Sequence, residues 1–171
     1  ALTPWEVPIL KTWVPEKKIQ VIRNGMDPVL FIDVKKNTFK KSLGIRGKMV
    51  LFFGRLHPTK APHLFVQLAK EILRERKDID FVIVGPDEGE LERVQRLSAG
   101  EKKVHVYGPI HGKKNIAAMF QDAAVYVMPS YREGLPLTLF EAMASGVPIV
   151  ATPCNGVPYE LSEPENGFLV P

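Results

Sequence analysis

One stretch of this sequence, residues 129–152 (PSYREGLPLTLFEAMASGVPIVAT), constrains the fold more than any other. It follows the apolar run AAVYVM, which is typical of a strand, and it opens with a loop that contains Gly134 and Pro136. A short apolar helix is predicted from about Leu137 until Gly146, and a second apolar strand, PIVAT, follows at once. Strand, loop, helix and strand in this order form a βαβ unit, so the sequence predicts a parallel sheet.

Two glutamates of this stretch, Glu133 and Glu141, are candidates for a binding site. The predicted helix is apolar on nearly every side and should be buried, so a carboxylate at Glu141 costs free energy unless it is paired or hydrogen-bonded. The unpaired amides at the helix start, near Leu137 and Thr138, would suit a phosphate group. These features favour a nucleotide site over the alternative, a core helix whose glutamate caps a neighbouring backbone.

The rest of the chain repeats the alternation of apolar strands and helices. A helix is predicted after Lys60, with Thr59 as its N-cap and Pro62 in its first turn. An alternating segment at 18–23 (KIQVIR) is also predicted to be a strand, and the lysine-rich loop after it carries a short helix near residues 40–44. The predicted buried strands span residues 49–53, 80–84, 104–107 and 124–128, and a last apolar segment spans 168–170.

Two cations, Arg55 and Lys60, lie in the loop that follows the strand at 49–53 and begins with Gly54. Open α/β sheets bind ligands at the carboxyl ends of their strands. Arginine suits bidentate contact with phosphate and lysine acts as a point charge, so this loop favours a phosphate site over two solvated surface charges. Gly85, after the strand at 80–84, is equally compatible with a nucleotide contact and with an ordinary turn.

Length and charge narrow the class of protein. A chain of 171 residues suits a single domain, with residues 1–18 as an irregular lead-in. No signal pattern or membrane-spanning run is present, and the single cysteine fits a reducing compartment such as the cytoplasm. The first 60 residues hold 12 Lys and Arg against 4 acids, which suits an anionic ligand or membrane head groups as well as scattered surface lysines.

Several common site types are excluded. No basic patch alternates with aromatic residues, so a nucleic-acid partner is not expected. The sequence has no G-x-G-x-x-G fingerprint, no P-loop and no G-x-S-x-G elbow, and the histidines at 57, 63, 105 and 111 lack metal-ligand spacing.

Taken together, these residues resemble the C-terminal domain of the retaining glycosyltransferases of family four, which have the two-domain GT-B fold. Glu133 and Glu141 reproduce that family's E-x7-E pattern inside the specific context EGLPLTLFEAMASGVP. The resemblance implies an α/β fold, a Rossmann-like doubly wound parallel sheet with helices on both faces, as one half of a GT-B enzyme. The matching segments are VIRNGMD at 21–27, GRLHPTK at 54–60, VGPDEGE at 84–90, VYGPI at 106–110, residues 129–152, GVPYEL at 156–161 and NGFLVP at 166–171.

The resemblance also implies roles for individual residues. Arg55 and Lys60 would hold the donor diphosphate and stabilise the leaving nucleotide, Glu133 would contact the transferred sugar, and these three are the expected catalytic residues. Glu141 would accept hydrogen bonds from the ribose. The remaining residues expected to bind the nucleotide sugar are Gly85, Tyr107, Gly108 and Ile110 on the base side, Gly54 in the loop of Arg55 and Lys60, and Gly134, Leu135, Pro136, Leu137 and Thr138 beside the sugar and phosphates.

The sequence departs from the family pattern in two places. Ala61 stands where the family often has Gly after the lysine, and Gly85-Pro86-Asp87 replaces a G-x-G turn, which leaves the base-side contacts open. The family's N-terminal domain, which carries the acceptor site, is not found in the 171 residues, so this chain is expected to bind donor and to transfer little alone.

The expected function is therefore transfer of a sugar, of the hexosyl type, from a nucleotide-diphosphate donor with retention at the anomeric carbon. The alternatives are a nucleotide-sugar epimerase of similar fold and a non-catalytic nucleotide-sugar-binding module. The resemblance implies a sugar, lipid-linked or polysaccharide acceptor, work in polysaccharide or glycolipid biosynthesis at the cytoplasmic membrane surface, peripheral membrane contact, and no metal or other cofactor.

Overall fold

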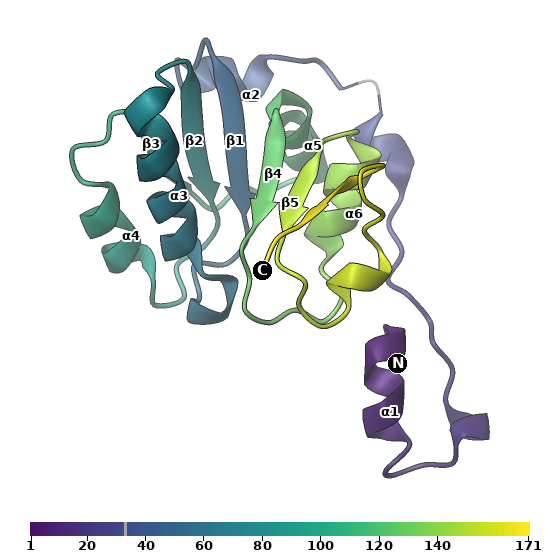
Figure 1. Ribbon diagram of the computed structural model, residues 1–171. Coiled ribbons are helices and arrows are strands. Elements are labelled where there is room, and N and C mark those ends of the chain that lie inside the picture. The colour runs from purple at the N-terminus through teal and green to yellow at the C-terminus, as the bar shows by residue number, and fades with distance from the viewer. Residues whose placement is uncertain (33) are drawn as a thin grey trace.

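The computed structural model describes residues 1–32 and 34–171, and these contain a six-stranded parallel sheet (Figure 1). The strand order is β3-β2-β1-β4-β5-β6, so the chain winds outward in both directions from β1 and β4. This order is that of a doubly wound Rossmann-like sheet, and it confirms the predicted fold class. The strands are β1 (Lys48–Phe53), β2 (Ile79–Val84), β3 (Val104–Gly108), β4 (Val125–Met128), β5 (Ile149–Ala151) and β6 (Gly167–Leu169).

Helices cover both faces of the sheet. One core contains Leu51 and Val82 and lies under α2, α5 and α6, whereas the other contains Phe52 and Phe81 and lies under α3 and α4. Neighbouring residues of one strand point to opposite faces, so burial on both faces explains why β1 and β2 read as continuous apolar runs. The helices are α1 (Val7–Leu10), α2 (Thr38–Ser42), α3 (Pro62–Glu75), α4 (Leu91–Ser98), α5 (Lys113–Asp122) and α6 (Leu137–Ala144).

The βαβ unit expected around residues 129–152 is present as β4, α6 and β5, and β4 pairs with β5 in parallel. The short helix expected near residues 40–44 is α2, and the last apolar segment supplies the edge strand β6. In the described part of the chain, no helix is both long and apolar enough to cross a bilayer.

The prediction of a strand at residues 18–23 is wrong. Lys18 ends a short 3₁₀ turn (Glu16–Lys18), and the residues after it belong to no described strand. The Ile22 amide donates instead to the Ala1 carbonyl at 2.8 Å, so this segment pairs with the chain start, away from the sheet. Alternation predicts an extended backbone, but only the tertiary fold supplies a neighbouring strand.

The N-cap predicted for α3 is also wrong. Thr59 lies inside a 3₁₀ turn (Pro58–Lys60) whose cap is His57, and α3 begins only at Pro62. Between them Ala61 adopts a left-handed conformation with φ of +48°. The resemblance implies a glycine at this position, and glycine adopts such a φ at no steric cost.

Residues 1–27 form an arm whose first part, with α1, lies below the sheet and whose last part rises beside α6 (Figure 1). The first 18 residues, expected to be an irregular lead-in, hold α1 and two 3₁₀ turns (Pro4–Glu6 and Glu16–Lys18). Several contacts attach the arm to the domain: Arg23 pairs with Glu160 at 2.6 Å, the Asn24 side chain donates to the Leu135 carbonyl at 2.7 Å, and the buried Thr3 packs against Gly156.

Candidate functional site

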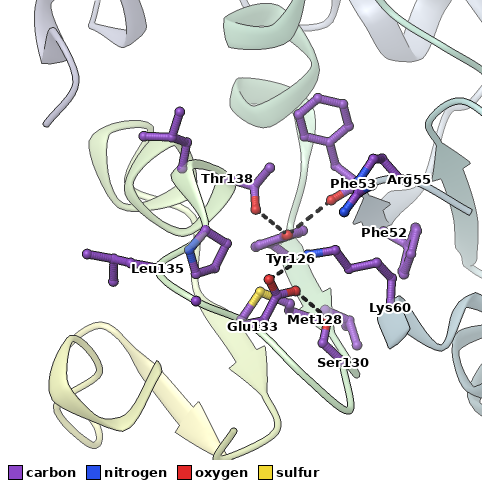
Figure 2. Close-up of a pocket in the computed structure, with 15 residues that line it drawn as sticks. Phe52, Phe53, Arg55, Lys60, Tyr126, Met128, Ser130, Glu133, Leu135 and Thr138 are labelled. Atoms are coloured by element: carbon purple, nitrogen blue, oxygen red, sulfur yellow. Dashed lines mark hydrogen bonds and ion pairs between the residues drawn. The ribbon is translucent and has the colours of Figure 1, made fainter. Parts of the chain in front are cut away.

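A cavity of about 270 Å³ opens at the carboxyl ends of β1 and β4, the two strands between which the winding direction reverses (Figure 2). This is the position where ligands bind in open α/β sheets. The ends of β1 and β4, the loops that follow these two strands and the start of α6 form its wall. The lining residues are Phe52, Phe53, Gly54, Arg55, Lys60, Tyr126, Val127, Met128, Ser130 and residues 133–138.

Glu133 is the buried carboxylate of this cavity, with 4% of its side chain exposed. Its Oε2 lies 2.5 Å from Lys60 Nζ, and its Oε1 accepts a hydrogen bond from Ser130 Oγ at 2.7 Å (Figure 2). Its backbone amide donates to Asn155 Oδ1 at 3.1 Å. A buried carboxylate requires such pairing, and these contacts fix the position of the Glu133 side chain.

Lys60 reaches the cavity because the chain makes a 3₁₀ turn directly after β1. The His57 ring accepts a hydrogen bond from the Thr59 amide at 3.2 Å, which caps this turn and gives His57 a structural role. The Thr59 carbonyl accepts from the Tyr131 amide at 2.8 Å, so the loop after β1 is tied to the loop after β4. The predicted cation and the predicted sugar-binding carboxylate are therefore held side by side.

Arg55, the second predicted cation, lies at the rim of the cavity. Its guanidinium pairs with Glu88 at 2.7 Å, and more than half of its side chain is exposed. An exposed pair of this kind contributes little to stability, so Arg55 remains available to an anionic ligand at small cost.

The N-terminus of α6 supplies amide donors to the cavity wall. Pro136 is the N-cap and offers no side-chain cap, and the amides of Leu137 and Thr138 have no acceptor among the described residues. Tyr126 lies beneath, where its hydroxyl is 3.0 Å from Thr138 Oγ1 and 3.2 Å from the Phe53 carbonyl (Figure 2). Burial raises the pKa of Tyr126 well above its ordinary value, so this phenol stays neutral.

Glu141 differs from expectation. The helix α6 buries only Leu139 and Ala142, so its other sides are partly open and Glu141 is half-buried. The reason is that α6 packs against β5, α5 and the 3₁₀ turn at Pro28–Phe31 and buries only this one face. In residues 1–32 and 34–171 the Glu141 carboxylate has no hydrogen bond or ion pair, and burial raises its pKa above the ordinary range. It lies one turn deeper than the amides, outside the cavity lining.

Replacing Glu141 with Gln is expected to raise the free energy of unfolding at neutral pH. A carboxyl whose pKa is raised in the folded state stabilises the fold below its ordinary pKa and loses that contribution as pH rises through the raised value. The difference between variant and wild type should therefore grow from pH 4 to pH 7, as measured by urea unfolding. A difference that does not change with pH would contradict this.

The base-side residues predicted from the sequence lie elsewhere. Tyr107 and Ile110 line a second cavity, of about 240 Å³, in which Tyr107 packs edge-on against Phe39 with ring centroids 5.1 Å apart. Gly108 accepts a hydrogen bond from the Gly85 amide at 2.8 Å. A Cβ on Gly85 would lie 1.8 Å from the Gly54 carbonyl oxygen, so a glycine is required there for packing between the ends of β1 and β2.

Sequence reasoning missed Ser130 and Asn155. Ser130 follows the carboxyl end of β4, and that position is itself a signal for a ligand-side residue. Asn155 has φ of +47°, a conformation that asparagine tolerates better than most residues, but its approach to Glu133 is a tertiary contact. No cluster of three or more His, Cys, Asp or Glu suited to a metal ion occurs among the described residues, and the expectation that none is required stays a prediction.

Comparisons with known proteins agree on one family. A family model described as "Glycosyl transferases group 1" matches residues 47–171. The D-inositol 3-phosphate glycosyltransferase of Streptomyces avermitilis is 35% identical over 130 residues, which cover 70% of this chain and 28% of that protein. The chain thus spans well under half the length of the curated relatives that it matches.

Two solved structures are similar. The C-terminal domain of LpcC, a glycosyl transferase group 1 family protein from Francisella tularensis, superposes with a TM-score of 0.74 at 26% identity, covering 85% of this chain and 80% of that one. The pneumococcal O-GlcNAc transferase GtfA, solved with UDP and GlcNAc, superposes with a TM-score of 0.66 at 25% identity, covering 74% of this chain and 25% of that one.

Proposed function

Because this chain belongs to the glycosyl transferases group 1 family, we propose that it is the donor-binding half of an enzyme that transfers a sugar from a nucleotide-diphosphate donor with retention at the anomeric carbon. The observation that carries the proposal is the cavity at the reversal point of the sheet, where a partly buried lysine, a buried glutamate and two unpaired helix amides meet. Cations and helix amides suit a diphosphate, and a carboxylate suits sugar hydroxyls.

The diphosphate is assigned to the Leu137 and Thr138 amides, with Lys60 and Arg55 as counter-charges. As the sugar leaves, negative charge grows on the nucleotide diphosphate, and fixed cations in a low-dielectric cavity stabilise that charge. This places on side chains the work that a metal ion would otherwise do, so the reaction is proposed to need no metal.

Glu133 is assigned to the hydroxyls of the transferred sugar. It lines the cavity, and Lys60 and Ser130, which each donate to one of its carboxylate oxygens, fix its position. Glu141 is assigned to the ribose hydroxyls, whose donors would satisfy its unpartnered carboxylate. The base is assigned to the side of Gly85 and of the Tyr107–Ile110 turn.

The acceptor is assigned to the rest of a longer protein, since the chain covers only 28% of the Streptomyces relative. A sugar, a lipid-linked sugar or a polysaccharide would then meet the donor across a cleft between two domains. Peripheral contact with the cytoplasmic face of a membrane fits the excess of lysine and arginine in the first 60 residues.

Calorimetric titration of the chain with UDP, GDP and ADP and with UDP-glucose, GDP-mannose and ADP-glucose tests the proposal. One nucleotide family should bind selectively, because specificity depends on hydrogen bonds to one base. At about a hundredfold its dissociation constant the ligand should also stabilise the fold by roughly 2.7 kcal/mol. Glu141→Gln should weaken binding of the nucleotide, although it stabilises the free protein at neutral pH.

A protein that binds none of these ligands would refute donor binding. A full-length relative that interconverts nucleotide sugars without transferring them would favour the epimerase alternative, and one that binds but neither transfers nor isomerises would favour a non-catalytic module.

A further inference from the structure

Glu133 lies at the meeting point of three loops, each of which follows a different strand. Lys60 comes from the loop after β1, Ser130 from the loop after β4 and Asn155 from the loop after β5. Lys60 and Ser130 bind separate carboxylate oxygens, and Asn155 accepts from the backbone amide of Glu133. The side chain is therefore fixed by one charged partner, Lys60, and one neutral partner, Ser130, and its backbone by a second neutral partner, Asn155.

The charged partner, Lys60, is also proposed to bind the diphosphate. Lys60 lines the same cavity as the α6 amides, where the proposed diphosphate binds. An ammonium has three donors and can contact two anions, but each anion weakens its hold on the other. Bound diphosphate would thus draw Lys60 toward itself and leave Glu133 with less charge compensation.

The neutral partners do not face this competition. Ser130 is 1% exposed, and its hydroxyl donates to Glu133 Oε1 from three residues away in the same loop. Thr152 Oγ1 donates to the Ser130 carbonyl and fixes the backbone on the other side. Ser130 therefore keeps the carboxylate in place independently of the position of Lys60.

We infer that Ser130 is a positioning residue: it holds the Glu133 carboxylate toward the donor sugar when bound diphosphate draws Lys60 away from Glu133. It governs recognition of the sugar and not of the nucleotide. Asn155 acts in the same way through the Glu133 backbone. This inference rests on the proposed function of the cavity.

The test compares two affinities in the same variant, those for a nucleoside diphosphate and for its sugar conjugate, with the three pairs named above. Ser130→Ala should leave affinity for the diphosphate within about twofold and lower that for the sugar conjugate by about tenfold, the loss expected for one hydrogen bond to a charged group. A variant that merely loosened the fold would lower both affinities alike, so the ratio separates positioning from stability.

Two further variants keep the test independent of folding. In Asn155→Gly the new glycine tolerates the φ of +47°, and the side-chain acceptor is removed. This variant should therefore also lower the affinity for the sugar conjugate relative to that for the diphosphate. Ser145→Ala is the matched control, because the buried Ser145 hydroxyl has no hydrogen-bond partner among the described residues and lies outside the cavity lining. It should change neither affinity.

The outcomes are distinguishable. Diphosphate binding with an unchanged ratio in both Ser130→Ala and Asn155→Gly would overturn the inference and leave the proposed function intact. A wild-type chain that binds none of the nucleotides would overturn both.

Discussion

Replacing Lys60 with Met is expected to lower the free energy of unfolding by about 3 kcal/mol and to abolish measurable nucleotide binding. Methionine keeps much of the apolar stem and removes the charge, so Glu133 remains as a buried carboxylate without its cation. The Lys60 and Glu133 side chains are 19% and 4% exposed, which excludes most of the water that could replace the lysine. Urea unfolding measures the stability and calorimetry the binding.

A double-mutant cycle isolates the pair. Adding Glu133→Gln to Lys60→Met removes the uncompensated charge and should recover most of the lost stability, while binding stays absent. The matched control is Lys11→Met, since Lys11 and Glu16 are 2.6 Å apart but 42% and 71% exposed. That change should cost less than about 1 kcal/mol. Equal costs for the two lysine variants would show that burial of the Lys60 pair does not govern its strength.

Gly85→Ala should be the most damaging single substitution at the sheet edge, at about 3 to 5 kcal/mol. Gly85 has φ of +155°, and an added Cβ would lie 1.8 Å from the Gly54 carbonyl oxygen and 2.7 Å from its carbon. Both atoms belong to backbone that is hydrogen-bonded between β1 and β2, because the Gly54 amide donates to the Val84 carbonyl at 3.0 Å. The clash can therefore be relieved only if the ends of β1 and β2 separate, next to Arg55 at the rim of the cavity.

Two other glycines serve as controls for the Gly85→Ala variant. Gly89→Ala meets no atom within 4 Å but has φ of +101°, so it should cost only the backbone strain of about 1 to 2 kcal/mol. Gly25→Ala has neither a close atom nor a positive φ and should be neutral. Chemical denaturation of the three variants gives the order, and a Gly85→Ala protein within 1 kcal/mol of wild type would show that the strand ends yield easily.

Local patterns were sufficient to predict most of the fold. The strands β1, β2 and β4 are runs of large apolar residues closed by Gly or Pro, and such runs form strands buried on both faces whatever their partners. The start of α6 after Pro136 and its end before Gly146 follow from the conformations that proline and glycine prefer. Local patterns gave the wrong result for the alternating segment at 18–23, since an extended backbone becomes a strand only when another strand lies beside it.

The candidate site was predictable in part for a similar reason. Arg55, Lys60 and the first turn of α6 follow the carboxyl ends of β1 and β4, and parallel strands bring those ends to one edge. The relative burial of the two glutamates was not predictable, because the uncovered side of α6 depends on what packs against it. The roles of Ser130 and Asn155 depend on contacts between loops that are adjacent only in the folded chain.

The sequence by itself determined the doubly wound sheet, the family and the edge at which the cavity opens, because each depends on periodicity, on turn residues or on a contiguous motif. Only the tertiary structure decided that Glu133 and not Glu141 is the deeply buried carboxylate, and that Lys60, Ser130 and Asn155 converge on it. The physical reason is that burial and hydrogen bonding depend on distances between segments far apart along the chain, here 73 residues from Lys60 to Glu133.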